Sequence, residues 1–319
     1  MRYGLPYKGS KNAIAEWIVN KLPKAEIFVD LFFGGGAVTH RAMLSGKYNR
    51  FIVNDIDARL PKLFLECAYG QHTIEKHPEW VTREEFNARK AEDAYTALVW
   101  SFGNNGKDYL YGADIEEMKH AYHIACYENN VEPLKAWGYH LQKSDKVEVY
   151  ERYLEYQRQV KTQSPQCQLE IVTRQIEIER LQSLQSLQSL QSLQSLQSLQ
   201  SHGADFSAVP IPKGALIYCD IPYTGTNCGK YGGFDHKRFY EWAEQQDNIF
   251  ISEYWMPDNF IQYAQIEKTV LSASNGNSQT AKEKIYTNRR TYERMTDEQK
   301  ELIRAWNGEQ MNIEDLIGW

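Results

Sequence analysis

The sequence predicts an α/β fold in which a mainly parallel sheet is interrupted by an inserted helical segment. Short apolar runs alternate with helical patterns in the first 60 residues, and the same alternation returns after about residue 203. The residues between about 61 and 180 carry helical signals and few strand-like runs. Alternating strands and helices favour a parallel sheet, because each helix returns the chain to the edge where the next strand begins.

The N-terminal part has the order helix, strand, glycine turn, helix, strand. Apolar residues recur at helical spacing in "SKNAIAEWIVNKLP", and Pro23 ends that pattern. "EIFVDLFFGGG" is a short apolar strand that ends in an acid and a glycine turn. "AVTHRAMLSG" is a helix closed by Gly46, and "RFIVNDID" is a second buried strand that ends in acids. This order is a βαβ unit, which indicates two parallel strands.

The middle block predicts three helices. "TREEFNARKAEDAYTALVWSFG" begins with a capping box, Thr82 with Glu85 three residues later, and is expected to continue as one helix to Gly103. "DIEEMKHAYHIACYENN" and "KVEVYERYLEYQRQVK" are the other two. The segment "SFGNNGKDYLYG", residues 101–112, is rich in turn residues and aromatics. It is either a turn between two helices or, as the resemblance described below implies, a segment that faces DNA.

Seven copies of Leu-Gln-Ser run from Leu181 to Ser201. A leucine at every third residue drifts around an α-helix and alternates faces on a strand. Because leucine and glutamine are good helix formers, we favour a helix whose leucines contact several neighbours. A spacer produced by repeat expansion is the alternative, and we assign the repeat no chemistry.

The α/β signals return in "ALIYCD", "NIFISEY" and "IEKTVLSAS", which are predicted strands, and in "DHKRFYEWAEQQ", a predicted helix between the first two. The tail contains one further helix, "DEQKELIRAWN". We therefore expect an α/β domain formed by residues 1–60 and 203–290, a helical insertion at 61–180, a connector at 181–201 and a helical tail at 291–319.

Composition restricts the class of protein. The chain has 319 residues, a net charge of −6, and five cysteines that form no CxxC pair or metal-ligand spacing. This pattern, without a signal peptide or long apolar span, predicts a reduced, cytoplasmic, soluble protein with no structural zinc. His120 and His123 lie three apart on a predicted helix, but no acid or cysteine set accompanies them, so we expect no metal site. The negative charge argues against a protein that coats nucleic acid through basicity alone, although it leaves room for a local basic cleft.

Two acidic strand ends are candidate binding positions. In "FVDLFFGGG" the glycines allow close backbone approach to a ligand, while Asp30 disfavours phosphate and suits an ammonium group. Asp55 in "IVNDID" lies about 20 residues after the glycine turn, where a carboxylate can bind ribose hydroxyls. The alternatives are a tight turn without a ligand for the first stretch and an ordinary turn acid for the second.

A third strand end, "DIPYTG", carries the chemistry of an amine site. Ionised Asp220 only accepts hydrogen bonds, and the carbonyl of Ile221 is a second acceptor beside it. Two adjacent acceptors match the two hydrogens of one amino group, and Tyr223 offers a flat face to a planar ring. This stretch is suited to the exocyclic amine of a nucleobase. Cys219 is expected on the opposite face of its strand, in the core.

These stretches, in this order, resemble the Dam-like DNA adenine-N6 methyltransferases of phage or bacterial type, the D12 class with the alpha motif order. That family has a "YPGGK"-like segment, an acid-x-F-x-G-x-G loop, an acidic second strand, a helical target-recognition insertion and D-P-P-Y. The matching segments here are "YKGSK" (Tyr7 to Lys11), "DLFFGGG", "NDID", the helical block and "DIPY". The resemblance covers residues 1–60 and about 203–290 well, and the middle only as helical and variable.

The resemblance implies a Rossmann-like sheet that binds S-adenosylmethionine and methylates double-stranded DNA, with a monomer favoured. It implies that Tyr7 and Lys11 lie at the rim of the cofactor site and that Asp55 binds the ribose. Asp30, Phe32 and the loop Gly34, Gly35 and Gly36 would contact the cofactor's methionine part. "ADF" resembles the family's adenine-holding segment, with Asp205 toward the cofactor's adenine amino group and Phe206 beside the ring.

The implied catalytic residues are Asp220, Ile221, Pro222 and Tyr223, acting on a flipped-out adenine as in restriction-modification systems. Ile221 stands where the family usually has proline, and its carbonyl can still serve as the acceptor. The following loop, "TGTNCGKYGG", is expected to cover the flipped base, with Lys230 available to a phosphate. The alternatives are methylation of cytosine N4 or of RNA, or a catalytically inactive relative that binds nucleic acid.

Overall fold

The computed structural model describes residues 3–162, 199–223, 233–271 and 278–308. By internal contacts the chain divides into two compact units. The first comprises the described residues of Met1–Ala13, Gly34–His40 and Arg59–Leu196; the second comprises those of Ile14–Phe33, Arg41–Ala58 and Gln197–Trp319. The contacts therefore group the N-terminal segment and the glycine turn with the helical segment. The domain boundaries expected at 61 and 180 stay predictions.

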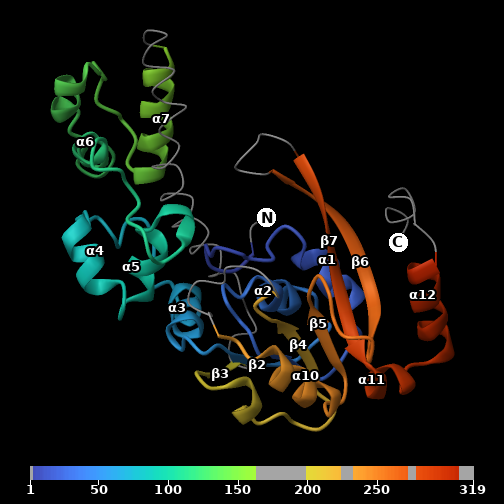
Figure 1. Cartoon of the computed structure of the whole chain (residues 1–319). Helices are drawn as coiled ribbons and strands as arrows, with labels where there is room; N and C mark the ends of the chain where they lie inside the picture. The colour runs from blue at the N-terminus through green and yellow to red at the C-terminus, as the bar shows by residue number, and fades with distance from the viewer. Residues whose placement is uncertain (1–2, 163–198, 224–232, 272–277, 309–319) are drawn as a thin grey trace. The chain divides into compact units, whose positions relative to one another are not determined.

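The second unit contains a seven-stranded sheet in the order β3-β2-β1-β4-β5-β7-β6 (Figure 1). The strands are β1 (Ile27–Asp30), β2 (Arg50–Asn54), β3 (Leu199–His202), β4 (Leu216–Asp220), β5 (Ile249–Ser252), β6 (Phe260–Leu271) and β7 (Ser278–Asn288). The first five pair in parallel. The parallel sheet that the sequence predicts is confirmed, although β3 was not among the predicted strands. Strand β7 runs antiparallel to both β5 and β6, which closes the sheet with a hairpin.

Each face of this sheet is covered by buried side chains. On one face Val29 and Ile217 pack in a cluster with Phe239 and Ala243 of α10 (His236–Glu244). On the other face Phe28 lies 4.8 Å from Tyr48, measured between ring centroids. The remaining helices of the second unit are α1 (Ala15–Lys21), α11 (Arg289–Glu293) and α12 (Asp297–Gly308). Helix α2 (Ala37–Leu44) is divided between the two units.

The first unit is helical, as predicted. Its helices are α3 (Arg59–Ala68), α4 (Arg83–Arg89), α5 (Ala94–Val99), α6 (Glu116–Glu128) and α7 (Val149–Lys161), with short 3-10 turns η1 (Phe102–Asn104) and η2 (Glu132–Trp137). The capping box at Thr82 and Glu85 is confirmed, because both of its hydrogen bonds form.

The single helix predicted from Thr82 to Gly103 is wrong, because the chain breaks between α4 and α5. Asp93 begins the second helix: its carboxylate accepts a hydrogen bond from the Tyr95 amide at 3.0 Å and another from the Thr96 hydroxyl. An aspartate that caps a new N-terminus competes with helix continuation.

The last copy of the Leu-Gln-Ser repeat is a strand. Leu199 to Ser201 form most of β3, which pairs in parallel with β2 at the edge of the sheet. The predicted helix is therefore wrong for this copy, since the parallel edge of β2 provides backbone partners that outweigh helix propensity. The other copies, residues 181–198, lie outside the described residues.

Segment 101–112 forms a turn with short antiparallel pairing in the first unit. The Phe102 amide donates to the Asp108 carbonyl at 2.9 Å, and the Leu110 amide donates to the Trp100 carbonyl at 2.9 Å. The side chain of Phe102 is 55% exposed at this turn. That the segment faces DNA stays a prediction.

Within the first unit, the N-terminal segment packs closely on the glycine turn. The Gly4 amide donates to Nδ1 of His40 at 2.9 Å, and the Leu5 amide donates to the Gly35 carbonyl at 2.6 Å. Gly4 has a φ of +73°, and a Cβ there would lie 2.3 Å from the Gly35 oxygen. Only glycine fits this position. Burial lowers the pKa of His40 to about 4.

We predict that His40 makes folding stability depend on pH between 4 and 6.5. Its pKa is about 6.5 when unfolded and about 4 when folded, so the unfolded state binds more protons and stability falls as pH falls. The loss between pH 7 and pH 4 from this residue is about 3 kcal/mol. Denaturant unfolding across this range measures it.

His40→Asn keeps an acceptor for the Gly4 amide but cannot titrate, so it is expected to remove this part of the pH dependence. The exposed His140→Asn serves as the control. Equal pH dependence in wild type and His40→Asn would contradict the prediction.

Candidate active site

The strand order reverses between β1 and β4, which makes this position the topological switch point of the sheet. Strand β2 lies on one side of β1 and β4 on the other, with Asp30 opposite Tyr218 in the register. Both strands run in parallel, so their carboxyl ends, Asp30 and Asp220, lie at the same edge. Ligands of open α/β sheets bind outside the carboxyl ends of strands at such a switch point. Asp30 is only 2% exposed there.

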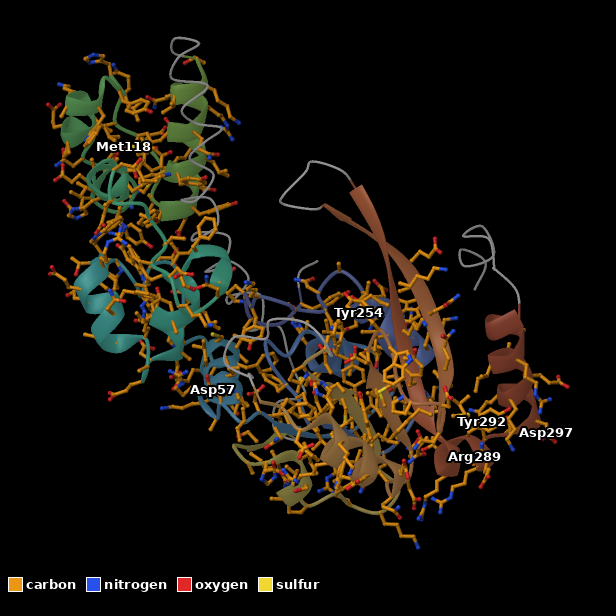
Figure 2. The ribbon with its side chains drawn as sticks, viewed as in Figure 1. Asp57, Met118, Tyr254, Arg289, Tyr292 and Asp297 are labelled. Atoms are coloured by element: carbon orange, nitrogen blue, oxygen red, sulfur yellow. The ribbon has the colours of Figure 1, made fainter. Side chains whose placement is uncertain are left out.

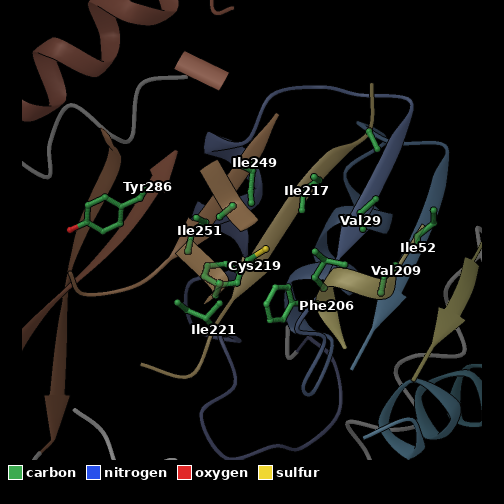
Figure 3. Close-up of a cluster of buried hydrophobic side chains, with 14 of the residues drawn as sticks. Val29, Ile52, Phe206, Val209, Ile217, Cys219, Ile221, Ile249, Ile251 and Tyr286 are labelled. Carbon is green, nitrogen blue, oxygen red and sulfur yellow. The ribbon is translucent and has the colours of Figure 1, made fainter. Parts of the chain in front are cut away.

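Alternation along β4 separates its acid from its apolar residues. Ile217, Cys219 and Ile221 enter the apolar cluster on one face, so Tyr218 and Asp220 point to the other (Figure 3). The expectation that Cys219 is a core residue is confirmed. Burial, and then the charges of Asp30 and Asp220, raise the pKa of its thiol. A buried thiol with a raised pKa is a poor nucleophile.

Three carboxylates lie around the Tyr218 phenol. Burial raises its pKa well above the ordinary value, and Asp220, Asp30 and Glu283 raise it further. Its hydroxyl lies 2.8 Å from the Ser252 hydroxyl. The phenol thus stays neutral beside these carboxylates.

The ring of Tyr223 is held by two side chains. Its hydroxyl donates to Oε2 of Glu283 at 2.8 Å, and its centroid lies 4.4 Å from that of Tyr254 at an interplanar angle of 67°. Tyr254, labelled in Figure 2, follows β5. Burial and then the charges of Asp220 and Glu283 raise the pKa of Tyr223, which keeps its hydroxyl a donor.

The backbone beside this ring has its own contact. Nε2 of His236, the first residue of α10, lies 2.7 Å from the Pro222 carbonyl and donates to it. Asp235 caps the N-terminus of the helix, and its side chain accepts a hydrogen bond from the Arg238 amide at 3.0 Å. The start of α10 therefore holds the turn that follows Asp220.

Asn54, at the end of β2, connects three chain segments. Its Nδ2 donates to the carbonyls of Leu31 at 3.1 Å and Ala204 at 3.0 Å, and its Oδ1 accepts from the Ala204 amide at 3.0 Å. Its own carbonyl accepts from the Phe33 amide at 2.9 Å. Gly203 allows this approach, since a Cβ there would lie 2.3 Å from the Ala58 Cβ.

The predicted "ADF" residues occupy different environments. Asp205 forms a two-point ion pair with Arg238, at 3.0 and 2.6 Å, and this pairing, chiefly, lowers its pKa to about 2. Phe206 is buried, with its centroid 5.8 Å from that of Phe32, and the Arg238 guanidinium lies over its ring. The structure thus brings Phe32 and Phe206 together. Their roles, and that of Asp205, toward a cofactor stay predictions.

Asp55 is buried at the end of β2 and accepts a hydrogen bond from the Asp57 amide at 2.9 Å. This is a turn contact of the kind that acids at strand ends often make. Binding of ribose by Asp55 stays a prediction.

The other predicted cofactor residues belong to the first unit. Lys11 is buried, and a Cβ on Gly35 would lie 2.7 Å from the Tyr7 Cβ. Gly34 and Gly36 have φ values of +50° and +68°. The structure therefore brings Tyr7 against the glycine turn and shows why glycine is needed there. The predicted cover loop, residues 224–232 with Lys230, lies outside the described residues.

The sequence analysis missed Glu283, His236, Asn54 and Arg238. Asn54 lies in "IVNDID", the segment that was considered as a binding position only because of Asp55. His236 could have been found from its place at the start of a predicted helix close after "DIPY". Glu283 and Arg238 carry no local signal.

Residues 7–288, nearly the whole chain, match the family described as D12 class N6 adenine-specific DNA methyltransferase. The chain belongs to this family. The resemblance inferred from its motifs is confirmed, as are the Rossmann-like fold and the assignment as an S-adenosylmethionine-dependent DNA methyltransferase. A comparison with curated proteins found no match.

In this methyltransferase the departure from D-P-P-Y has a structural role. Ile221 is 2% exposed and packs in the cluster with Phe239 and Met256. An isoleucine here supplies apolar contacts in the core, while its backbone remains at the strand end.

The described residues of the methyltransferase contain no group of three or more His, Cys, Asp or Glu that could hold a metal ion. His123 instead donates from Nε2 to the Pro78 carbonyl at 2.8 Å, and His120 lies against Trp80. None of their helices is both long and apolar enough to cross a membrane.

We predict that Ile221→Ala lowers the free energy of unfolding by roughly 2–5 kcal/mol, because it leaves a cavity in the core. Ile221→Val is the matched control, with an expected loss of roughly 0.5–1.5 kcal/mol. Denaturant unfolding measures both. Methyl transfer by the folded fraction is expected to stay within about threefold of wild type, since the side chain does not face Asp220. An unchanged stability with a large loss of activity would show that the side chain contacts the substrate instead.

Proposed function

We propose that this methyltransferase transfers a methyl group from S-adenosylmethionine to N6 of an adenine that is flipped out of double-stranded DNA. The observation that carries the proposal is the position of Asp220. Its carboxylate ends β4 at the switch point of the sheet and is followed by Pro222 and by Tyr223, whose ring is held in place. A flipped base requires such a pairing of amine acceptors with a stacking ring.

Asp220 and the Ile221 carbonyl accept the two hydrogens of the target amine. This removes the amine lone pair from conjugation with the ring and directs it toward the methyl group. Tyr223 stacks on the base, which offsets part of the few kcal/mol that unstacking costs. Catalysis is then mainly orientation and electrostatics, and no covalent nucleophile is needed.

The residues fit the proposed methyl donor. S-adenosylmethionine supplies an electrophilic methyl group on a positively charged sulfur. Asp30, a buried carboxylate at the end of β1, suits the ammonium group of the donor, and Asp55 suits its ribose. The contribution of Tyr7, Lys11 and Gly34 to Gly36 remains an expectation from the family motifs.

Cytosine N4 and RNA are the alternative targets, because two acceptors and a ring recognise an amine rather than one base. We favour a monomeric enzyme acting on DNA in the cytoplasm. Hydrolysis of DNA from cells that express the protein, with separation of N6-methyladenine from N4-methylcytosine, tests this choice. N6-methyladenine alone supports the proposal, while N4-methylcytosine or methylated RNA alone overturns it.

We predict that Asp220→Ala and Asp220→Asn each lower methyl transfer by at least about 100-fold, because alanine removes one amine acceptor and asparagine replaces part of it with a donor. The assay is incorporation of labelled methyl groups into unmethylated genomic DNA. Asp247→Asn, at an exposed ion pair with Arg290, is the control and should stay within twofold of wild type. Retained activity in folded Asp220→Ala would exclude Asp220 from catalysis.

A further inference from the structure

Glu283 is a buried carboxylate on a strand that the sequence pattern did not predict. It lies on β7 and is 6% exposed. Its Oε2 accepts the hydrogen bond from the Tyr223 hydroxyl at 2.8 Å. Sixty residues separate the two in the chain, so the contact exists only because β7 pairs with β5. The mechanism proposed above assigns Glu283 no role.

The position of Glu283 follows from the register of β7. Ile285 lies opposite Ser252 of β5, and alternation places Glu283 on the same face of the sheet as Ile285. Ser252 contacts the Tyr218 hydroxyl on that face, and Tyr218 in turn lies near Asp220. Glu283 therefore belongs to the face that carries the proposed amine acceptor.

The contacts of Tyr223 divide into those that hold its ring and those that hold its backbone. The ring has the hydroxyl contact to Glu283 and the edge contact to Tyr254. The adjacent backbone has the contact from His236 to the Pro222 carbonyl. Loss of the Glu283 carboxylate would remove the hydrogen bond to the Tyr223 hydroxyl and leave the contact from His236 to the Pro222 carbonyl in place.

We propose that Glu283 is a positioning residue that fixes the ring of Tyr223 in the orientation needed to stack on the target base. The inference rests on the proposed function. A hydrogen bond from a phenol to an ionised carboxylate is stronger than one between neutral groups, so it suits this task. Small misplacements of a positioning group can cost up to about 100-fold in rate.

The test compares Glu283→Met, Glu283→Gln, Tyr223→Phe and the double variant Glu283→Met/Tyr223→Phe. Methionine has a similar length but accepts hydrogen bonds only weakly, whereas glutamine keeps an acceptor oxygen. Glu267→Met is the control on the same hairpin, because Glu267 is exposed and pairs with Lys282 at 3.3 Å. The measurements are kcat with unmethylated genomic DNA and KM for S-adenosylmethionine.

We expect Glu283→Met to lower kcat about 10-fold or more, with KM for S-adenosylmethionine changed less than about twofold. Glu283→Gln should recover most of the rate, and Glu267→Met should match wild type. In the Tyr223→Phe background, Glu283→Met should lower kcat by no more than about twofold, since the hydroxyl it holds is already absent. An equal loss in both backgrounds would overturn the proposal.

A second cycle measures the contact without using activity. Hydrogen bonds to charged groups contribute about 1.5–3 kcal/mol. Each single variant loses this contact, and the double variant loses it only once. The change in the unfolding equilibrium constant of the double variant should therefore be at least about tenfold smaller than the product of the changes in the two single variants. If the changes in unfolding free energy of the two single variants add up to that of the double variant, the hydrogen bond between Glu283 and Tyr223 does not contribute to stability and the proposal fails. Non-additive stability with a wild-type enzyme that methylates no nucleic acid would instead contradict the proposed function and, with it, the role of Glu283 in orienting the ring for a base.

Discussion

The edge of the sheet where β1, β2 and β4 end depends on the hydrogen bonds of the Asn54 side-chain amide. With its two donor hydrogens and its oxygen it bonds the chain leaving β1, at Leu31, and the segment that precedes β4, at Ala204. These segments are irregular, so their backbone groups have no ladder to join. Buried backbone groups without partners are costly. One residue at the end of β2 thus satisfies the polar groups of its neighbours and fixes the position of both.

A second constraint on this edge of the sheet is the electrostatic repulsion among its carboxylates. Asp30, Asp220 and Glu283 all act on the Tyr218 phenol, and two of them are almost fully buried. The Tyr223 phenol relieves part of this repulsion, because its hydroxyl donates to Glu283. A positively charged ligand bound at Asp30, as proposed for the methyl donor, would relieve more of it, so ligand binding and the stability of this edge are linked.

The elements that the sequence predicted are those with a local pattern. Strands β1, β2, β4 and β5 are apolar runs, and the acid that ends β4 stands beside the proline and tyrosine that mark the site. Strand β7 was missed because its sequence, "SQTAKEKIYTN", is mostly polar, and β6 was predicted only in its second half. The contacts of Glu283 and Arg238 could not be predicted, since each partner is brought close by the sheet or by α10 rather than by spacing in the chain.

Strand β3 has a consequence for how this chain can vary in length. Its residues Leu199, Gln200 and Ser201 are the final copy of a seven-copy repeat and pair with Phe51 to Val53. Because all copies are identical, gain or loss of one copy changes the chain by three residues and leaves the same Leu-Gln-Ser-His sequence before Gly203. Insertion or deletion of a whole copy therefore leaves the sequence that pairs with β2 unchanged.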